Sequence, residues 1–142
     1  MTEELFRAIY VSTATGDFGD EELVPLLDVS RRNNAASDIT GVLGYHDYSF
    51  LQVLEGPKGP VEALLASIAR DTRSTGMLIL DRSRVDERVF GEWSMGWVRA
   101  SDLMRAGLDP GVLFVRDTPS AMVNAMLDAF RQTTALTRSP TQ

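Results

Sequence analysis

The stretch DITGVLGYHDYSFLQVLEG, residues 38–56, decides the fold, because it predicts two strands around a tight turn at HDYS. In the second strand the side chains alternate sides, so Phe50, Gln52 and Leu54 share one face. Gln52 is then an amide between two large hydrophobic residues. A buried amide without a partner costs about 1 to 3 kcal/mol, so we expect a hydrogen-bond partner for Gln52 inside the protein.

The segment before this hairpin predicts a strand and then a helix. LFRAIYVST, residues 5–13, alternates and predicts a first strand with Tyr10 on the same side as Phe6. Residues 20–34 carry apolar side chains at helical spacing and predict an amphipathic helix. Pro25 stands too close to the start of an ideal helix, so we expect the first turn to begin late or to be distorted.

The segment after the hairpin predicts a second helix and two more strands. GPKGP places Pro60 near the first turn of a helix that runs to about residue 71. TGMLILDRS, residues 75–83, predicts a fourth strand. EWSMGWV, residues 92–98, predicts a fifth strand whose one face holds Trp93, Met95 and Trp97.

This order predicts an α+β fold of the ferredoxin-like βαββαβ type with a fifth strand, in a mixed five-stranded sheet. Right-handed crossovers place the two helices on one face of the sheet. The other face is assigned to C-terminal helices, because Thr118 followed by Pro119 predicts a helix start there. We therefore expect a folded domain over residues 1–103 and a C-terminal helical extension over residues 104–142, which offers a surface for output or for a partner.

The composition narrows the class of protein. With 142 residues, of which 44% are hydrophobic, the chain is long enough for one domain with a core. The formal net charge of −6 argues against general nucleic-acid binding. The sequence has no cysteine and one histidine, which leaves little for a metal site or a catalytic triad. We expect a cytoplasmic protein that does not bind membranes, because no apolar run reaches spanning length and the N-terminus does not resemble a signal peptide.

Several polar residues are predicted to point inward. Tyr10 and Gln52 lie on strands that are neighbours in a ferredoxin-like sheet, so they are candidate partners for each other. Asn34 extends the apolar stripe of the first helix. Leu26 and Ile68 would form two apolar walls between the helices, with the amides at the rim. This arrangement describes a site for a flat heteroaromatic ligand.

Plainer interpretations exist for the same residues. An inward amide is more often bonded to backbone than to a ligand, and Tyr10 alone would be a core tyrosine. Asn33 and Asn34 could cap the first helix in the left-handed conformation. Arg70, Asp71 and Arg73 could belong to a solvated helix end, or the two guanidiniums could hold a phosphate.

Five blocks of sequence together closely resemble the BLUF domains, blue-light sensors that use a flavin. The blocks are IYVS, RRNNAASDITG, SFLQVLEGP, RDTR and FGEWSMG, and they fall in order between residue 5 and about residue 103. The resemblance is to a short, single-domain type with C-terminal helices. It implies FAD bound between the two helices, with contacts from Leu26, Asn33, Asn34, Gln52, Ile68, Asp71 and Arg73.

The resemblance also implies roles within that site. Asn34 and Gln52 would bond the polar edge of the ring and Asn33 would support the site. Arg73 would sit near the phosphates. Tyr10 would donate an electron and a proton to the excited flavin. One departure is Ser67, which stands where family members often have a histidine or an arginine.

The implied function is that of a blue-light photoreceptor and not of an enzyme. Rearranged hydrogen bonds at Gln52 would be relayed by Met95 and Trp93 on the fifth strand to the C-terminal helices. The signal would reach a separate effector protein or another copy of the chain in a dimer or larger homo-oligomer. Two alternatives are a flavin-free oligomerisation module and a small phosphate-handling enzyme of ferredoxin-like fold. The enzyme is disfavoured because no arginine follows the first strand in a glycine-rich anion loop.

Overall fold

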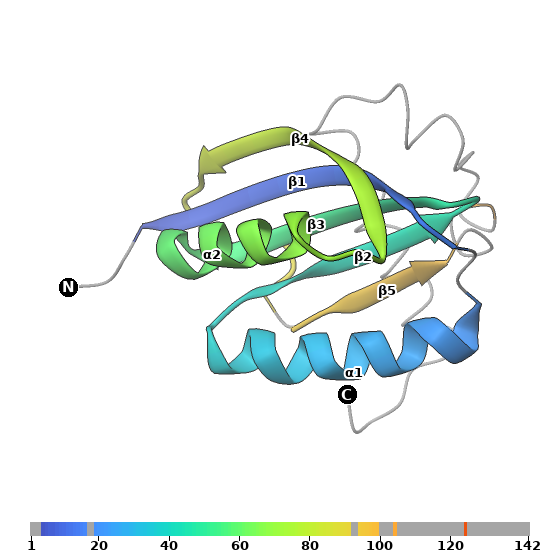
Figure 1. The fold of residues 1–142 in the computed structure, drawn as a ribbon. Coiled ribbons are helices and arrows are strands. Elements are labelled where there is room, and N and C mark those ends of the chain that lie inside the picture. Colours follow the sequence, from blue (N-terminus) through green and yellow to red (C-terminus); the bar gives the residue numbers. More distant parts are fainter. Residues whose placement is uncertain (1–3, 17–18, 92–93, 100–103, 105–123, 125–142) are drawn as a thin grey trace.

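A computed structural model describes residues 4–16, 19–91, 94–99, 104 and 124 of the chain. Its elements are β1 (Leu5–Ala14), α1 (Asp20–Ala36), β2 (Thr40–His46), β3 (Ser49–Pro57), α2 (Lys58–Ala69), β4 (Ser74–Arg84) and β5 (Gly96–Arg99) (Figure 1). The predicted order of strands and helices is confirmed. The predicted C-terminal helices lie outside the described residues, apart from two single positions.

The strands form one mixed sheet in the order β4-β1-β3-β2-β5. β1 pairs antiparallel with both β3 and β4, and β2 pairs antiparallel with β3 but parallel with β5. Both helices lie on one face of this sheet (Figure 1). The arrangement confirms the ferredoxin-like α+β fold and the fifth strand.

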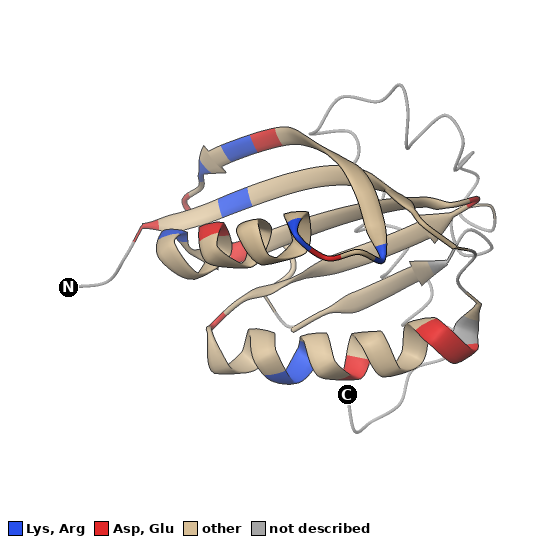
Figure 2. Ribbon diagram, viewed as in Figure 1, with Lys and Arg blue, Asp and Glu red and all other residues tan. Residues whose placement is uncertain are grey.

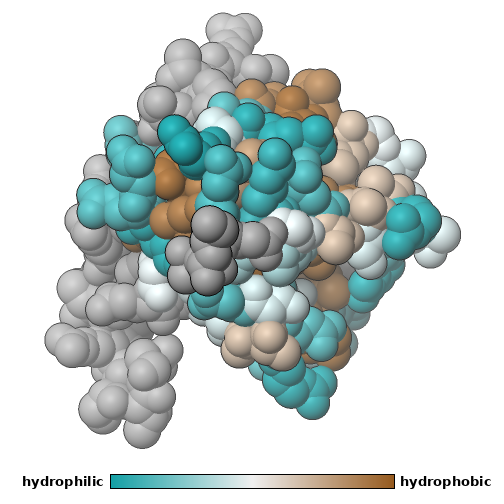
Figure 3. Space-filling view, turned by 90° about the vertical axis from the view of Figure 1, so that its left-hand side faces the viewer, coloured by the Kyte–Doolittle hydropathy of each residue, from teal (hydrophilic) through white to brown (hydrophobic). Residues whose placement is uncertain are grey.

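The core lies between that face and the helices. The alternating side chains of β1 and β3 that were predicted to share a face supply its floor, and apolar residues of α1 and α2 cover it. The buried members include Phe6, Ala8, Tyr10, Leu23, Leu27, Phe50, Leu54, Val61 and Leu65. On the side of the molecule shown in Figure 3, hydrophobic residues are scattered among hydrophilic ones. In the ranges that the structure covers, no helix is long and apolar enough to cross a bilayer.

Helix α1 starts at Asp20, so the predicted delay of its first turn is wrong. The N–H of Gly19, which precedes the helix, donates to Oε1 of Glu22 at 2.7 Å and so stabilises the start. Pro25 stands inside the helix and removes one N–H donor, the partner of the Glu21 carbonyl. Pro25 and Glu21 are both exposed, so that carbonyl remains accessible to water.

The β2–β3 hairpin closes through a two-residue loop. Asp47 and Tyr48 have φ values of 48° and 66°, as the primed turns of such loops require. In β2, a Cβ on Gly41 would lie 1.9 Å from the carbonyl oxygen of Val53 on β3, so only glycine fits at this position. The turn and the glycine together fix the register that pairs His46 with Ser49.

Strand β5 begins at Gly96, four residues later than predicted. Met95 therefore lies in a bend before the strand and not on a strand face shared with Trp97. The reason is that side chains of α1 bind the backbone carbonyls of Ser94 and Met95, so the ladder with β2 begins only at Gly96. Trp93 lies outside the described residues.

Candidate functional site

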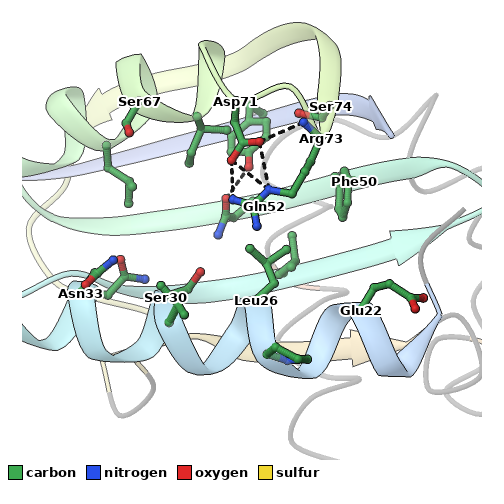
Figure 4. A pocket seen from close by; sticks show the side chains of 17 residues that line it. Glu22, Leu26, Ser30, Asn33, Phe50, Gln52, Ser67, Asp71, Arg73 and Ser74 are labelled. Carbon is green, nitrogen blue, oxygen red and sulfur yellow. Dashed lines mark hydrogen bonds and ion pairs between the residues drawn. The ribbon is translucent and has the colours of Figure 1, made fainter. Parts of the chain in front are cut away.

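A cavity of about 420 Å³ lies between α1 and α2, above β1 and β3. Every residue that the sequence resemblance assigns to the cofactor lines this cavity, together with Tyr10 and Ser67. Figure 4 shows Leu26, Ser30 and Asn33 on the α1 side, and Ser67, Asp71 and Arg73 on the opposite side. The cavity lining assigned from sequence is Leu26, Asn33, Asn34, Gln52, Ile68, Asp71 and Arg73.

The floor of the cavity holds a hydrogen-bonded pair from neighbouring strands. Tyr10 of β1 stands directly opposite Gln52 of β3 in the ladder. The Tyr10 hydroxyl donates to Oε1 of Gln52 at 2.5 Å, and both side chains are buried. The amide that looked anomalous in the sequence therefore has a partner within the protein.

The nitrogen of the same amide has a different partner. Nε2 of Gln52 donates to Sδ of Met95 at 3.2 Å, and Met95 is only 2% exposed. The Gln52 amide is thus held with its oxygen towards Tyr10 and its nitrogen towards Met95. Since Nε2 carries two hydrogens and Gln52 lines the cavity, the second N–H can serve a bound ligand.

The environment of Tyr10 keeps its hydroxyl protonated. Burial raises the pKa of Tyr10 well above its ordinary value, and the negative charge of Asp71 raises it further. Tyr10 therefore carries a proton at neutral pH, and the hydrogen bond directs this proton at Gln52.

Asp71 and Arg73 form an ion pair in the turn between α2 and β4. Nε of Arg73 lies 3.0 and 3.1 Å from the two carboxylate oxygens of Asp71, and Nη2 lies 2.5 Å from Oδ2. Hydrogen bonding to Arg73 lowers the pKa of Asp71, and the same bonds raise the pKa of Arg73, so both groups are charged. Charged residues of both signs follow one another where α2 gives way to β4 (Figure 2).

The two asparagines lie within α1 and do not cap it in the left-handed conformation. The helix ends at Ala36, and the residue with positive φ that follows is Asp38, at 58°. Asn34 is 3% exposed and its Nδ2 donates to the Ser94 carbonyl at 2.9 Å. Asn33 lies on the α1 side of the cavity (Figure 4).

Two charged residues near the site were not singled out from the sequence. Arg31 of α1 donates from Nε to the Met95 carbonyl at 2.9 Å. Glu55 of β3 is fully buried on the face of the sheet opposite Gln52 and pairs with Arg7. The alternation of β3 carried a signal for Glu55, because it places this acid with Leu51 and Val53. Arg31 carries no such signal, because an arginine on an exposed helical face resembles any solvated side chain.

Comparison with known proteins identifies the family of the chain. Residues 5–96 match the BLUF family, described as "Sensors of blue-light using FAD". The chain is 32% identical over 107 residues to photoactivated adenylate cyclase subunit alpha of Euglena gracilis, which covers 75% of this chain and 10% of that protein. It is 30% identical over 91 residues to the blue light- and temperature-regulated antirepressor BluF of Escherichia coli K12, which covers 64% of this chain and 23% of that protein. The chain thus spans a tenth to a quarter of these relatives.

Solved structures indicate the same family and cover more of the chain than the sequence matches do. BlrB, a BLUF protein in its dark state, superposes with a TM-score of 0.79 at 26% identity. The match covers 94% of this chain and 99% of the BlrB chain. The photoactivated state of BlsA superposes with a TM-score of 0.74 at 27% identity. The match covers 87% of this chain and 94% of the BlsA chain. The chain belongs to the BLUF family of blue-light sensors that use FAD.

Proposed function

We propose that Tyr10 and Gln52 are the photoactive pair of this sensor, with FAD bound in the cavity above them. The observation that carries the proposal is the buried hydrogen bond from the Tyr10 hydroxyl to Oε1 of Gln52, on the floor of the cavity. An oxidisable phenol and an amide that both donates and accepts are placed together where the cofactor would lie.

The residues that line the cavity fit a flavin ring in their chemistry. Leu26 of α1 and Ile68 of α2 supply apolar surface for the two faces of a flat ring, and about 420 Å³ lies within the usual range for a ligand pocket. The polar edge of the ring carries carbonyl acceptors on either side of an N–H donor. The free N–H of Gln52 and the guanidinium of Arg73 are donors for such an edge, and Asp71 is an acceptor.

The position of Arg73 favours contact with the ring over the expected contact with the phosphates. The bidentate pair with Asp71, whose charge acts on the buried hydroxyl of Tyr10, holds the guanidinium of Arg73 in the cavity lining. We propose that Asn33 and Asn34 complete the polar lining from the side of α1.

FAD supplies the light absorption and, once excited, a strong one-electron oxidant. Tyr10 is placed to give up one electron to such an oxidant and to pass its proton along the existing bond to Oε1 of Gln52. Once both the electron and the proton were back on Tyr10, Gln52 would be left rotated, or as a tautomer of the same composition. In this light-induced state, the hydrogen bonds of Gln52 to Tyr10 and to Met95 Sδ are rearranged.

The light-induced change is transmitted through the residues that Gln52 contacts. One rearranged hydrogen bond is worth about 1 kcal/mol, which shifts a two-state equilibrium about fivefold and does not unfold the domain. We propose that Met95 and Trp93 relay this change to residues 104–142, and from there to a separate effector protein or to another copy of the chain in a dimer or larger assembly. We assign no catalytic activity to the chain itself and place it in the cytoplasm.

The test is the absorption spectrum of the chain with FAD before and after blue light. The wild type is expected to show a small red shift that reverses in the dark. Tyr10→Phe is expected to bind FAD and lose the shift, since the electron and proton donor is gone. Tyr45→Phe is the matched control, because Tyr45 packs against Phe50 and does not line the cavity, so it should keep the shift. A shift that survives in Tyr10→Phe would exclude the donor role.

A further inference from the structure

Two side chains of α1 bind consecutive backbone carbonyls in the bend before β5. Nδ2 of Asn34 donates to the Ser94 carbonyl at 2.9 Å, and Nε of Arg31 donates to the Met95 carbonyl at 2.9 Å. The two donors are three residues apart, so they lie on one face of the helix. The helix therefore holds the backbone of the bend through two hydrogen bonds.

The hydrogen bond from Arg31 fixes the position of the Met95 backbone. A thioether is a weak acceptor, so its bond from Gln52 Nε2 does little to hold the chain in place. The bond from Arg31 is charge-assisted and belongs to the stronger kind. The location of the Met95 sulfur beside Gln52 therefore depends on Arg31 more than on the contact between Met95 and Gln52 itself.

Arg31 differs from Asn34 because it does not line the cavity. Among the described residues, its other polar contact is an ion pair with Asp28, at 3.5 Å between exposed side chains, and such pairs contribute little to stability. Within the part of the chain that the structure describes, an effect of Arg31 on the photochemistry therefore passes through the Met95 backbone.

We propose that Arg31 is a positioning residue that holds Met95 against Gln52 and thereby sets the lifetime of the light-induced state. The proposal rests on the function proposed above, in which Gln52 gives up and regains its bond to Met95. The return to the dark state restores that bond, so its rate depends on whether the acceptor is held in place. Loss of one charge-assisted bond predicts a change in the dark-recovery half-life of about tenfold, from the lower end of the free energy of such a bond.

The test combines Arg31→Ala, Met95→Ala and the double variant, each as the full chain with FAD. Arg31→Ala is expected to change the half-life in the same direction as Met95→Ala. In the Met95→Ala background the Arg31 substitution should add less than about 1.5-fold, because residues that act through one contact are not additive. Arg31→Lys should recover most of the wild-type half-life, since its ammonium can donate to the same carbonyl.

A second readout does not depend on photochemistry. With methionines labelled at the ¹³C methyl group, the Met95 resonance of the dark protein should move in Arg31→Ala. The matched control is Arg32→Ala, since Arg32 is exposed and makes no hydrogen bond or ion pair with the described part of the chain. It should leave both the half-life and the Met95 resonance unchanged.

Each possible failure identifies a different error. An unmoved Met95 resonance together with a wild-type half-life in Arg31→Ala would overturn the positioning role, while the red shift of the wild type would still support the proposed function. An Arg31→Ala effect of equal size with and without Met95 would also overturn it. A wild type with no red shift would refute the proposed function, and the resonance would still decide whether Arg31 positions Met95.

Discussion

The buried carboxylate of Glu55 is expected to be one of the strongest single anchors of the domain. It accepts from Nε and Nη2 of Arg7 at 2.9 and 2.7 Å. It also accepts from the backbone N–H groups of Val89, at 3.0 Å, and Phe90, at 2.8 Å. These bonds attach the segment between β4 and β5 to the face of the sheet that the helices do not cover.

Glu55→Ala leaves the Arg7 guanidinium, whose side chain is 17% exposed, and two backbone donors without this acceptor. Breaking a buried ion pair in this way costs about 3 to 5 kcal/mol, so we expect the free energy of unfolding to fall by about 4 kcal/mol. Glu55→Gln keeps one oxygen acceptor and is expected to lose about 2 kcal/mol. Glu62→Ala is the control, because its ion pair with Arg82 is exposed and 3.9 Å long, and it should lose less than about 1 kcal/mol.

The assay is urea unfolding followed by circular dichroism at one fixed FAD concentration, because bound ligand adds to the apparent stability. If Glu55→Ala leaves too little folded protein to measure, Glu55→Gln still gives a value. Losses below about 1 kcal/mol for both Glu55 variants, or a loss for Glu62→Ala as large as that of Glu55→Gln, would refute the anchoring role.

Two further predictions concern single side chains. Tyr48→Gly should raise the free energy of unfolding by about 1 kcal/mol, because Tyr48 occupies a left-handed conformation that glycine adopts without steric conflict. Urea unfolding measures this gain in stability. A loss of stability would contradict the turn assignment. Burial and then Asp71 raise the pKa of Tyr10, so the folded state holds this proton more tightly than the unfolded state. The stability that Tyr10 contributes is therefore complete below pH of about 10 and declines above it, with a slope of up to about 1.4 kcal/mol per pH unit. Tyr10→Phe should remove this part of the decline, and parallel stability curves for the two proteins between about pH 8 and 11 would contradict it.

Much of the fold was predictable because its determinants are local in the sequence. The alternation in residues 5–13 and in β3 indicated the face that the helices cover, and it correctly placed Tyr10 beside Gln52. The two-residue turn set the hairpin. Helical spacing also indicated the inward position of Asn34, which lines the cavity.

The remaining features depend on contacts between distant segments. The start of β5 is set by side chains of Arg31 and Asn34, about 60 residues earlier, so the local pattern extended the strand too far and placed Met95 on it. The helix tolerates Pro25 because the freed carbonyl is exposed, and sequence spacing does not show exposure. The partners of Glu55 are partly backbone N–H groups, which no side-chain pattern reveals.

The switching role of Gln52 is tested most directly by an infrared difference spectrum, light minus dark, of the chain with FAD and with ¹³C at the side-chain carbonyl of glutamine. The sequence has three glutamines, so Gln132 and Gln142 are replaced by Asn to leave the label on Gln52 alone. If Gln52 is the residue that switches, the labelled amide band should shift on illumination and return in the dark at the same rate as the visible red shift. A reversible red shift without any change in the labelled band would contradict the role of Gln52 as the residue that switches.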